Sequence, residues 1–259
     1  MQAPVSDPET SALAVYWRFF EGTNSRDPKQ VTDALNYPHV RISARSKANI
    51  VEQRQTHAGR MSFDPLISTG WDHTVGMEPE VLHVAPRKVH IKGGWTRYDR
   101  DGRPIMTNMV TYIATLADGQ WGLQSRFGTD TDLFWGKPED RPREVEVDLE
   151  SNARKAENIV SSALDLVGID NPRATRHCHF PFLGIHPGDV ESIADGDALR
   201  QRLPASKPLI SDVEAIQAGA TGANVTFRAT VSKRRVEGVF LVKVDDARWG
   251  IKGGSLITS

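Results

Sequence analysis

Residues 118–126 read Asp-Gly-Gln-Trp-Gly-Leu-Gln-Ser-Arg, and residues 245–251 read Asp-Asp-Ala-Arg-Trp-Gly-Ile. A turn followed by a Trp-Gly-aliphatic strand therefore occurs twice in this chain. Each copy follows an apolar strand-like run, Val110–Leu116 in the first case and Val236–Val244 in the second. The two tryptophans are 128 residues apart (249 − 121). This recurrence predicts two copies of one folding unit.

The parts of the chain before these strands match in the same order. Each half opens with apolar residues spaced three and four apart, which is the signature of one buried helix face. Tyr37-Pro38 and Phe180-Pro181 then each enter a strand-like run, with the prolines 143 residues apart (181 − 38). The helical residues are Ala12, Leu13, Val15, Tyr16, Phe19 and Phe20 in the first half and Ile159, Val160, Ala163, Leu164 and Val167 in the second.

A charged segment separates the two halves. Residues 137–150 contain nine charged residues and two prolines, a composition that buries little surface and is typical of a linker. We therefore expect a first domain at residues 1–136 that holds the functional pocket, a charged linker at 137–150, and a second domain at 151–259. Helices that precede an antiparallel hairpin such as Val89–Tyr98 with Thr107–Thr115 predict the α+β class.

Composition excludes several classes of function. The 259 residues include 32 Lys and Arg against 33 Asp and Glu, and this balance argues against nucleic-acid binding. No apolar run is long enough to span a membrane, and the chain starts without a signal-peptide pattern, so we expect a cytoplasmic protein. Cys178 is the only cysteine, which rules out an internal disulfide and a cysteine-rich zinc site. There is no Gly-rich phosphate loop, and we expect no cofactor.

Four motifs in order carry a resemblance to a known family: Tyr37-Pro38-His39-Val40-Arg41, Gly70-Trp71-Asp72-His73-Thr74, Thr96–Gly102 and Asp118–Arg126. Together they resemble the SnoaL-like branch of the nuclear transport factor 2-like (NTF2-like, cystatin-like cone) superfamily over residues 10–136. The resemblance implies a cone, in which helices pack into a curved antiparallel sheet with a pocket at its mouth. With the repeat, it implies a tandem duplication of two fused cone-shaped domains.

The second copy resembles the family less closely. Phe182 and Gly184 stand where the first copy has His39 and Arg41, and nothing in the second half matches the Gly-Trp-Asp-His stretch. The resemblance implies a degenerate domain that pairs sheet to sheet with the first within one chain. It also leaves room for a homo-oligomer.

His39, Arg41, Asp72 and His73 are the candidate catalytic residues. Period-two alternation places His39 and Arg41 on one strand face, which either lines the cone or lies outside it. An imidazole suits proton transfer, a guanidinium stabilises an enolate or carboxylate, and a carboxylate orients either group. The alternatives are an exposed strand face for the first pair and a capping Asp72 beside a packed tryptophan for the second.

Aromatic, amide and guanidinium side chains on the predicted strands could line the pocket, since ligand pockets are mainly apolar with a few placed polar groups. Core packing is the alternative for each aromatic residue. No metal is expected, because the histidines near Cys178 have no carboxylate close by, and that cysteine is expected to be structural. The candidate substrate-binding residues are Tyr16, Trp71, Trp95, Asn108, Tyr112 and Arg126.

The fold alone does not give the reaction. Ketosteroid isomerase-like members of the superfamily need an Asp base, and Phe19 stands at the position that aligns with it. The leading expectation is a cofactor-independent lyase or isomerase, doing acid–base chemistry of the isomerase, dehydratase, cyclase or C–C lyase type on a small aromatic or polyketide-like molecule. His39 or Asp72 would accept the proton, and Arg41 or His73 would stabilise charge. The alternative is a non-catalytic protein of the same fold that binds a small ligand or serves in assembly.

Overall fold

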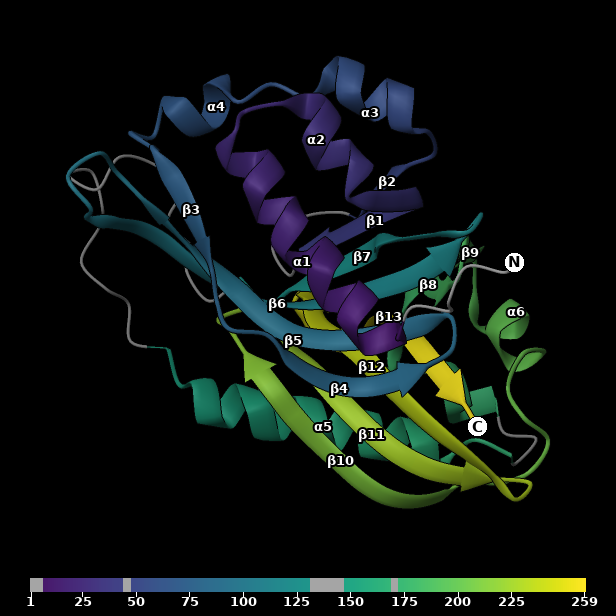
Figure 1. Ribbon diagram of the computed structural model, residues 1–259. Coiled ribbons are helices and arrows are strands. Elements are labelled where there is room, and N and C mark those ends of the chain that lie inside the picture. The colour runs from purple at the N-terminus through teal and green to yellow at the C-terminus, as the bar shows by residue number, and fades with distance from the viewer. Residues whose placement is uncertain (1–6, 44–47, 131–146, 169–171) are drawn as a thin grey trace, which may run out of the picture.

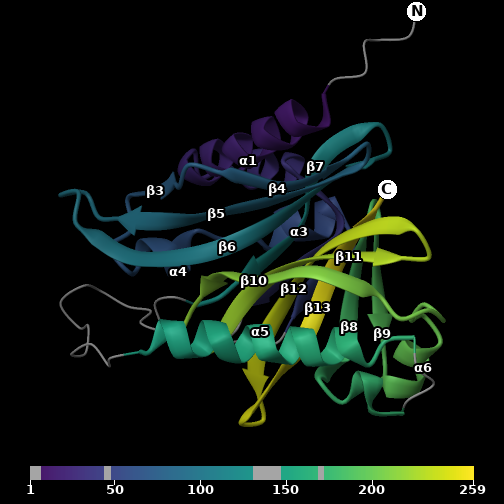
Figure 2. The same cartoon turned by 90° about the horizontal axis from the view of Figure 1, so that it is seen from below.

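The computed structural model describes residues 7–43, 48–130, 147–168 and 172–259. These residues form two curved sheets that pack face to face, with one long helix on the outer side of each sheet (Figures 1 and 2). The order of layers is helix, sheet, sheet, helix, as Figure 2 shows most clearly. The two fused cone-shaped α+β domains predicted from the repeat are confirmed.

The first domain begins with two helices, α1 (Pro8–Asn24) and α2 (Pro28–Asp33), and has two short ones, α3 (Arg54–Arg60) and α4 (Asp64–Ile67). Its sheet has the order β2-β1-β7-β6-β5-β3, and β4 also pairs with β5. All its strand pairs are antiparallel except β1–β7, which is parallel. The strands are β1 (Leu35–Ser43), β2 (Asn49–Val51), β3 (His73–Gly76), β4 (Glu80–Ala85), β5 (Lys88–Tyr98), β6 (Pro104–Ala117) and β7 (Gln120–Gly128).

Helix α1 fills the concave side of this sheet. Asp7 caps its start by accepting a hydrogen bond from the Thr10 amide at 2.8 Å, and Pro8 occupies the first turn, where its missing N–H costs nothing. The buried face is aromatic, and its rings contact the sheet edge to face. This face consists of Ala12, Val15, Tyr16, Phe19 and Phe20.

The second domain repeats this plan with one long helix, α5 (Leu149–Asp165), and a short one, α6 (Gly196–Arg200). Its sheet has the order β10-β11-β12-β13-β8-β9, again with a single parallel pair, β8–β13. Helix α5 starts two residues inside the predicted linker, most of which lies outside the described residues. The strands are β8 (Cys178–His186), β9 (Asp189–Ile193), β10 (Leu209–Ala218), β11 (Gly222–Val231), β12 (Arg234–Asp245) and β13 (Arg248–Thr258).

Strand register shows the duplication residue by residue. Leu35 of β1 lies opposite Leu123 of β7, two residues after the first Trp-Gly tryptophan. Cys178 of β8 lies opposite Ile251 of β13, two residues after the second. Leu35 and Cys178 each precede the strand proline by three residues. The two tryptophans therefore occupy equivalent strands.

The two sheets bury a shared core between the domains. Polar side chains cross this interface as well: Lys88 donates to the Ile185 carbonyl at 2.7 Å, and Gln217 donates to the Gly93 carbonyl at 2.6 Å. No helix in the described part of the chain combines the length and apolar character that a membrane-spanning helix needs. The apolar residues of the interface are Val40, Ile42, Ile113, Phe127, Leu183, Ile185, Val239 and Leu241.

Candidate functional site

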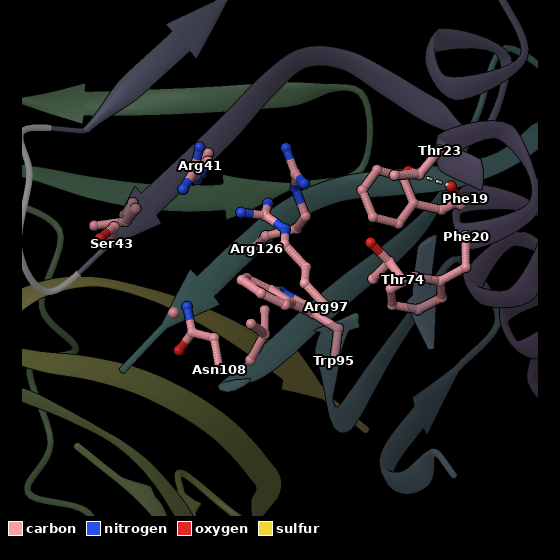
Figure 3. A pocket seen from close by; sticks show the side chains of 13 residues that line it. Phe19, Phe20, Thr23, Arg41, Ser43, Thr74, Trp95, Arg97, Asn108 and Arg126 are labelled. Carbon is pink, nitrogen blue, oxygen red and sulfur yellow. Dashed lines mark hydrogen bonds between the residues drawn. The ribbon is translucent and has the colours of Figure 1, made fainter. Parts of the chain in front are cut away.

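A small pocket opens on the concave side of the first sheet, beside the C-terminal turn of α1 (Figure 3). Its volume is about 80 Å³. Residues from α1, β1, β3, β5, β6 and β7 contribute to it, so the pocket depends on the curvature of the whole sheet. The lining residues are Phe19, Phe20, Thr23, Arg41, Ile42, Ser43, Thr74, Trp95, Arg97, Asn108, Val110, Arg126 and Gly128.

Three arginines lie around this pocket (Figure 3). Arg41 and Arg126 are direct neighbours in the β1–β7 register, and Arg97 comes from β5. Two of the guanidiniums lie over aromatic rings: Arg97 is 4.3 Å from the ring centre of Trp95, and Arg126 is 4.8 Å from that of Phe19. Stacking on a ring fixes the plane of each of these guanidiniums.

His39 holds Arg126 from behind the pocket. The imidazole is buried, and its Nδ1 donates a hydrogen bond to the Leu123 carbonyl at 2.9 Å. That bond leaves Nε2 as an acceptor, and Arg126 Nε donates to it at 3.3 Å. Burial, followed by the charge of Arg126, lowers the pKa of His39 well below 6.5, so the ring is neutral at pH 7. His39 therefore positions Arg126 and lies outside the pocket lining.

The pocket concentrates positive charge. Burial, followed by the nearby charge of Arg41, lowers the pKa of Arg97 to about 9 and that of Arg126 to about 10, so both stay protonated at neutral pH. Among the described residues, no Asp or Glu lines the pocket. The lining residue Ser43 donates hydrogen bonds from its hydroxyl to the carboxylate of Asp130, at 2.7 and 2.8 Å. Positive charge therefore dominates the described lining of the pocket.

Tyr112 lies directly behind the arginines. It faces Arg126 across the β6–β7 pair, and its buried hydroxyl has no hydrogen-bond partner among the described residues. Burial raises the pKa of Tyr112 well above 10, and the charges of Arg126, Arg41 and Arg97 partly offset this rise. Its hydroxyl therefore stays protonated.

Tyr16, the second predicted tyrosine, is committed to the core. Its hydroxyl donates to the Met77 carbonyl at 2.7 Å and lies 3.2 Å from the Gly94 carbonyl. Burial raises its pKa to about 12. It packs against the ring of Tyr112 and does not line the pocket.

The predicted Asp72–His73 stretch lies away from this pocket. The Asp72 carboxylate contacts His73 Nδ1 at 3.0 Å, and both side chains are about two-fifths exposed. His73 stacks on Tyr98, while the next residue of β3, Thr74, faces the pocket lining. Trp71 is buried and donates to the Thr74 hydroxyl at 2.9 Å. The structure thus brings together Arg41, Trp95, Asn108 and Arg126, with His39 and Tyr112 behind them.

Arg97 lines the pocket but was not among the candidate residues from the sequence. Its signal was available, because it lies two residues after Trp95 and so shares a strand face with it. In the part of the chain that the structure describes, no group of three or more His, Cys, Asp and Glu residues is placed to hold a metal ion. Cys178 is buried, and burial raises its pKa to about 12.

Comparison with known proteins concerns mainly the first domain. The family model described as "NTF2-like protein (DUF6841)" matches residues 11–129. A Nostoc punctiforme domain of unknown function with a cystatin-like fold is 13% identical, covers 61% of this chain and 94% of its own, and has a TM-score of 0.39. An NTF-2 like protein of unknown function from Shewanella oneidensis is 12% identical, with 47% and 98% coverage and a TM-score of 0.39. The search of the curated proteins gave no match.

The strand order, the helix on the concave side and the match over residues 11–129 agree with one another. The second sheet repeats the first, register by register. Residues 11–129 match the model of the NTF2-like family and have its fold, and the second sheet repeats that strand arrangement.

Proposed function

We propose that the first domain binds the charged end of a small planar organic anion, of the class of aromatic or polyketide-like carboxylic acids. The observation that carries this proposal is the cluster of Arg41, Arg97 and Arg126 around a pocket whose described lining residues include no Asp or Glu. Guanidiniums that are already stacked and hydrogen-bonded lose little freedom when they bind a carboxylate. A bound anion would also relieve the repulsion between the arginines.

The size of the pocket supports binding of the charged end of the ligand alone, with the rest of the ligand outside. A cavity of roughly 150 Å³ accommodates a benzene molecule, and this pocket has about 80 Å³. It therefore takes up a carboxylate and its neighbouring atoms, while the rest of the ligand extends past Trp95 towards the mouth. An indole face at that position suits a planar ligand body.

A second candidate is cofactor-independent proton-transfer chemistry in the same pocket, of the isomerase, dehydratase, cyclase or C–C lyase type. The observation that favours it is the neutral His39 imidazole behind three guanidiniums. A ligand that displaces Arg126 from His39 would leave Nε2 free to accept a proton, and the arginines would stabilise the enolate that forms. A binding protein returns its ligand unchanged, whereas such an enzyme consumes it at a rate that falls in His39→Gln.

Calorimetric titration with benzoate and its uncharged analogue benzamide tests the binding proposal. We expect saturable benzoate binding that Arg126→Gln weakens roughly tenfold to a hundredfold, the usual value of a charge-assisted hydrogen bond. Arg100→Gln is the matched control, because Arg100 is exposed on the hairpin after β5. Absence of benzoate binding, equal affinity for benzamide, or unchanged affinity in Arg126→Gln would each contradict the proposal.

A further inference from the structure

The second domain holds a larger cavity at the equivalent place, between α5 and the concave side of its own sheet. Its volume is about 270 Å³. Apolar side chains from α5, β8, β11, β12 and β13 form most of its wall. The wall of the cavity includes Ala163, Gly184, Val231, Val236, Phe240 and Gly254.

Register shows that the charged residues of the first pocket have been replaced here. The neighbouring pair Arg41–Arg126 on β1 and β7 corresponds to the neighbouring pair Gly184–Gly254 on β8 and β13. Arg126 and Gly254 each follow the Trp-Gly tryptophan by five residues (126 − 121 and 254 − 249). Two guanidiniums are thus absent from the second cavity, and both glycines lie in its wall.

Other polar or aromatic lining residues of the first pocket are also replaced by smaller apolar residues in the second cavity. Asn108 and Val236 each precede that tryptophan by 13 residues (121 − 108 and 249 − 236). Their cross-strand partners are Trp95 and Ala229, so an indole in the first pocket corresponds to a methyl group in the second. Two residues further along the same strand, Arg97 corresponds to Val231.

The helix explains the larger volume. The buried faces of α1 and α5 have the same spacing, which matches Phe19 with Ala163 and Phe20 with Leu164. Two aromatic rings that narrow the first pocket are therefore replaced by smaller side chains, both of which line the second cavity. Together with the lost arginines, this change produces a wider cavity whose remaining charged lining residues are Glu191 and Arg202.

We propose that the second domain binds an uncharged, largely hydrocarbon molecule of about eleven non-hydrogen atoms in this cavity. The size follows from the benzene standard of roughly six carbon atoms in 150 Å³. The apolar wall would gain free energy from burying a hydrocarbon chain or a fused ring. The ligand classes of the two domains therefore differ: a charged group in the first and an apolar body in the second.

The polar groups at the cavity rim suit a neutral hydroxyl or carbonyl end. Glu191 forms an ion pair with Arg202, which also donates to the Ala198 carbonyl at 2.7 Å. The other carboxylate oxygen of Glu191 lies 3.8 Å from His186 Nε2. Because Arg202 is already paired with an acid, the rim offers no unpaired cation to a carboxylate ligand. A hydroxyl group could donate to Glu191 instead.

Titration of the full chain with 1-decanol and with decanoate, followed by calorimetry, tests this assignment. We expect saturable binding of decanol that is at least about tenfold tighter than binding of decanoate. Ala163→Phe restores the ring found in the first domain and should weaken decanol binding roughly tenfold or more, because a phenyl ring fills about half of the cavity. Asn158→Phe places the same ring on the exposed face of α5 and should leave affinity unchanged.

A second variant keeps the test decisive if Ala163→Phe fails to fold. Val231→Arg places an arginine in the second cavity at the position equivalent to Arg97. It should reverse the ligand preference, so that decanoate binds more tightly than decanol. Thermal melting of each variant separates lost binding from lost structure. Absence of decanol binding to the wild-type protein, a preference for decanoate that persists when Arg126→Gln disables the first pocket, or full affinity in a folded Ala163→Phe protein would overturn the assignment.

Discussion

Two buried tyrosines meet edge to face inside the first domain, with ring centres 5.0 Å apart. Their hydroxyl groups are in opposite situations. Tyr16 donates to the Met77 carbonyl, whereas the Tyr112 hydroxyl has no hydrogen-bond partner among the described residues. A buried hydrogen bond contributes modestly to stability, but a buried polar group without a partner costs desolvation energy. The first domain therefore has one buried tyrosine hydroxyl with a structural partner and one without a partner among the described residues.

Removing the two hydroxyl groups should therefore have different effects on the free energy of unfolding. Tyr16→Phe removes a satisfied hydrogen bond and should lower the free energy of unfolding by about 1 kcal/mol. Tyr112→Phe should leave stability unchanged or raise it slightly, and it recreates Phe240, the residue at the equivalent position of the second domain. Urea denaturation of both variants checks this. A larger loss in Tyr112→Phe than in Tyr16→Phe would show that the hydroxyl of Tyr112 has a structural partner.

At the scale of elements, the Trp-Gly strands show why this motif recurs. A Cβ atom on Gly122 of β7 would lie 2.8 Å from the Asn36 backbone nitrogen, and one on Gly250 of β13 would lie 3.0 Å from the His177 carbonyl oxygen. Gly122 lets β7 lie close to the start of β1, its parallel partner. Gly250 does the same for β13 and the residues just before β8. The close approach of β7 to β1, and of β13 to β8, thus requires glycine at the same place in both copies.

Two glycine substitutions separate this packing effect from the general effect of glycine on the unfolded chain. Gly122→Ala should destabilise the protein by roughly 1–3 kcal/mol, because its methyl group collides with backbone. Gly59→Ala in α3, where a Cβ would meet nothing within 4 Å, should stabilise it by about 0.4–1 kcal/mol. Thermal melting and urea denaturation measure both changes. Equal effects of the two substitutions would refute the packing argument.

The sequence predicts most elements of this fold from periodicity and turn chemistry. The spacing in α1 and α5 and the Asp99–Gly102 turn between β5 and β6 are local signals. The parallel β1–β7 pair is not a local signal, because it joins Arg41 to Arg126, 85 positions apart (126 − 41), and depends on the whole sheet. Helices α3 and α4 bury no residue completely, so they lack the apolar period that would reveal them.

The candidate site divides in the same way. Arg41, Trp95, Asn108 and Arg126 are candidates from the sequence, and the structure places all four in the lining of one pocket. Side-chain direction at a turn is not encoded by spacing, and the structure places Asp72 and His73 outside the lining. The sequence did not predict the second cavity. Glycine, alanine and valine in place of charged and aromatic residues indicate only the absence of catalytic groups, whereas in the folded protein these small side chains leave space.

At the scale of the molecule, buried histidines join the two domains. His83 and His90 are hydrogen-bonded through Nδ1 at 3.0 Å, and they reach the second domain through Thr226 at 3.1 Å and Ser255 at 2.9 Å. Burial lowers the pKa of His83 to about 4, with Glu237 opposing the shift and Arg228 and Arg235 adding to it. Burial lowers the pKa of His90 well below 6.5.

These shifts predict acid sensitivity with a definite sign. An imidazole has a pKa of about 6.5 in the unfolded chain, so the unfolded state takes up protons first as the pH falls. Stability is therefore full above about pH 6.5, and each such histidine adds a loss of about 1.4 kcal/mol per pH unit below it. His90→Gln should lose one such contribution and so reduce the slope below that of the wild-type protein. Urea denaturation between about pH 5 and pH 7.5 measures these slopes, and a wild-type stability that is flat in this range would contradict the prediction.

The covalent link between the two copies also has an evolutionary consequence. In a symmetric pair of identical chains, every substitution is made twice, once in each pocket. Here Arg41 and Arg126 are encoded separately from Gly184 and Gly254, so a change in one cone leaves the other untouched. Because the two copies lie in one chain, each can change its sequence independently while the sheet-to-sheet contact is kept. One pocket is free to retain charge while its twin loses it.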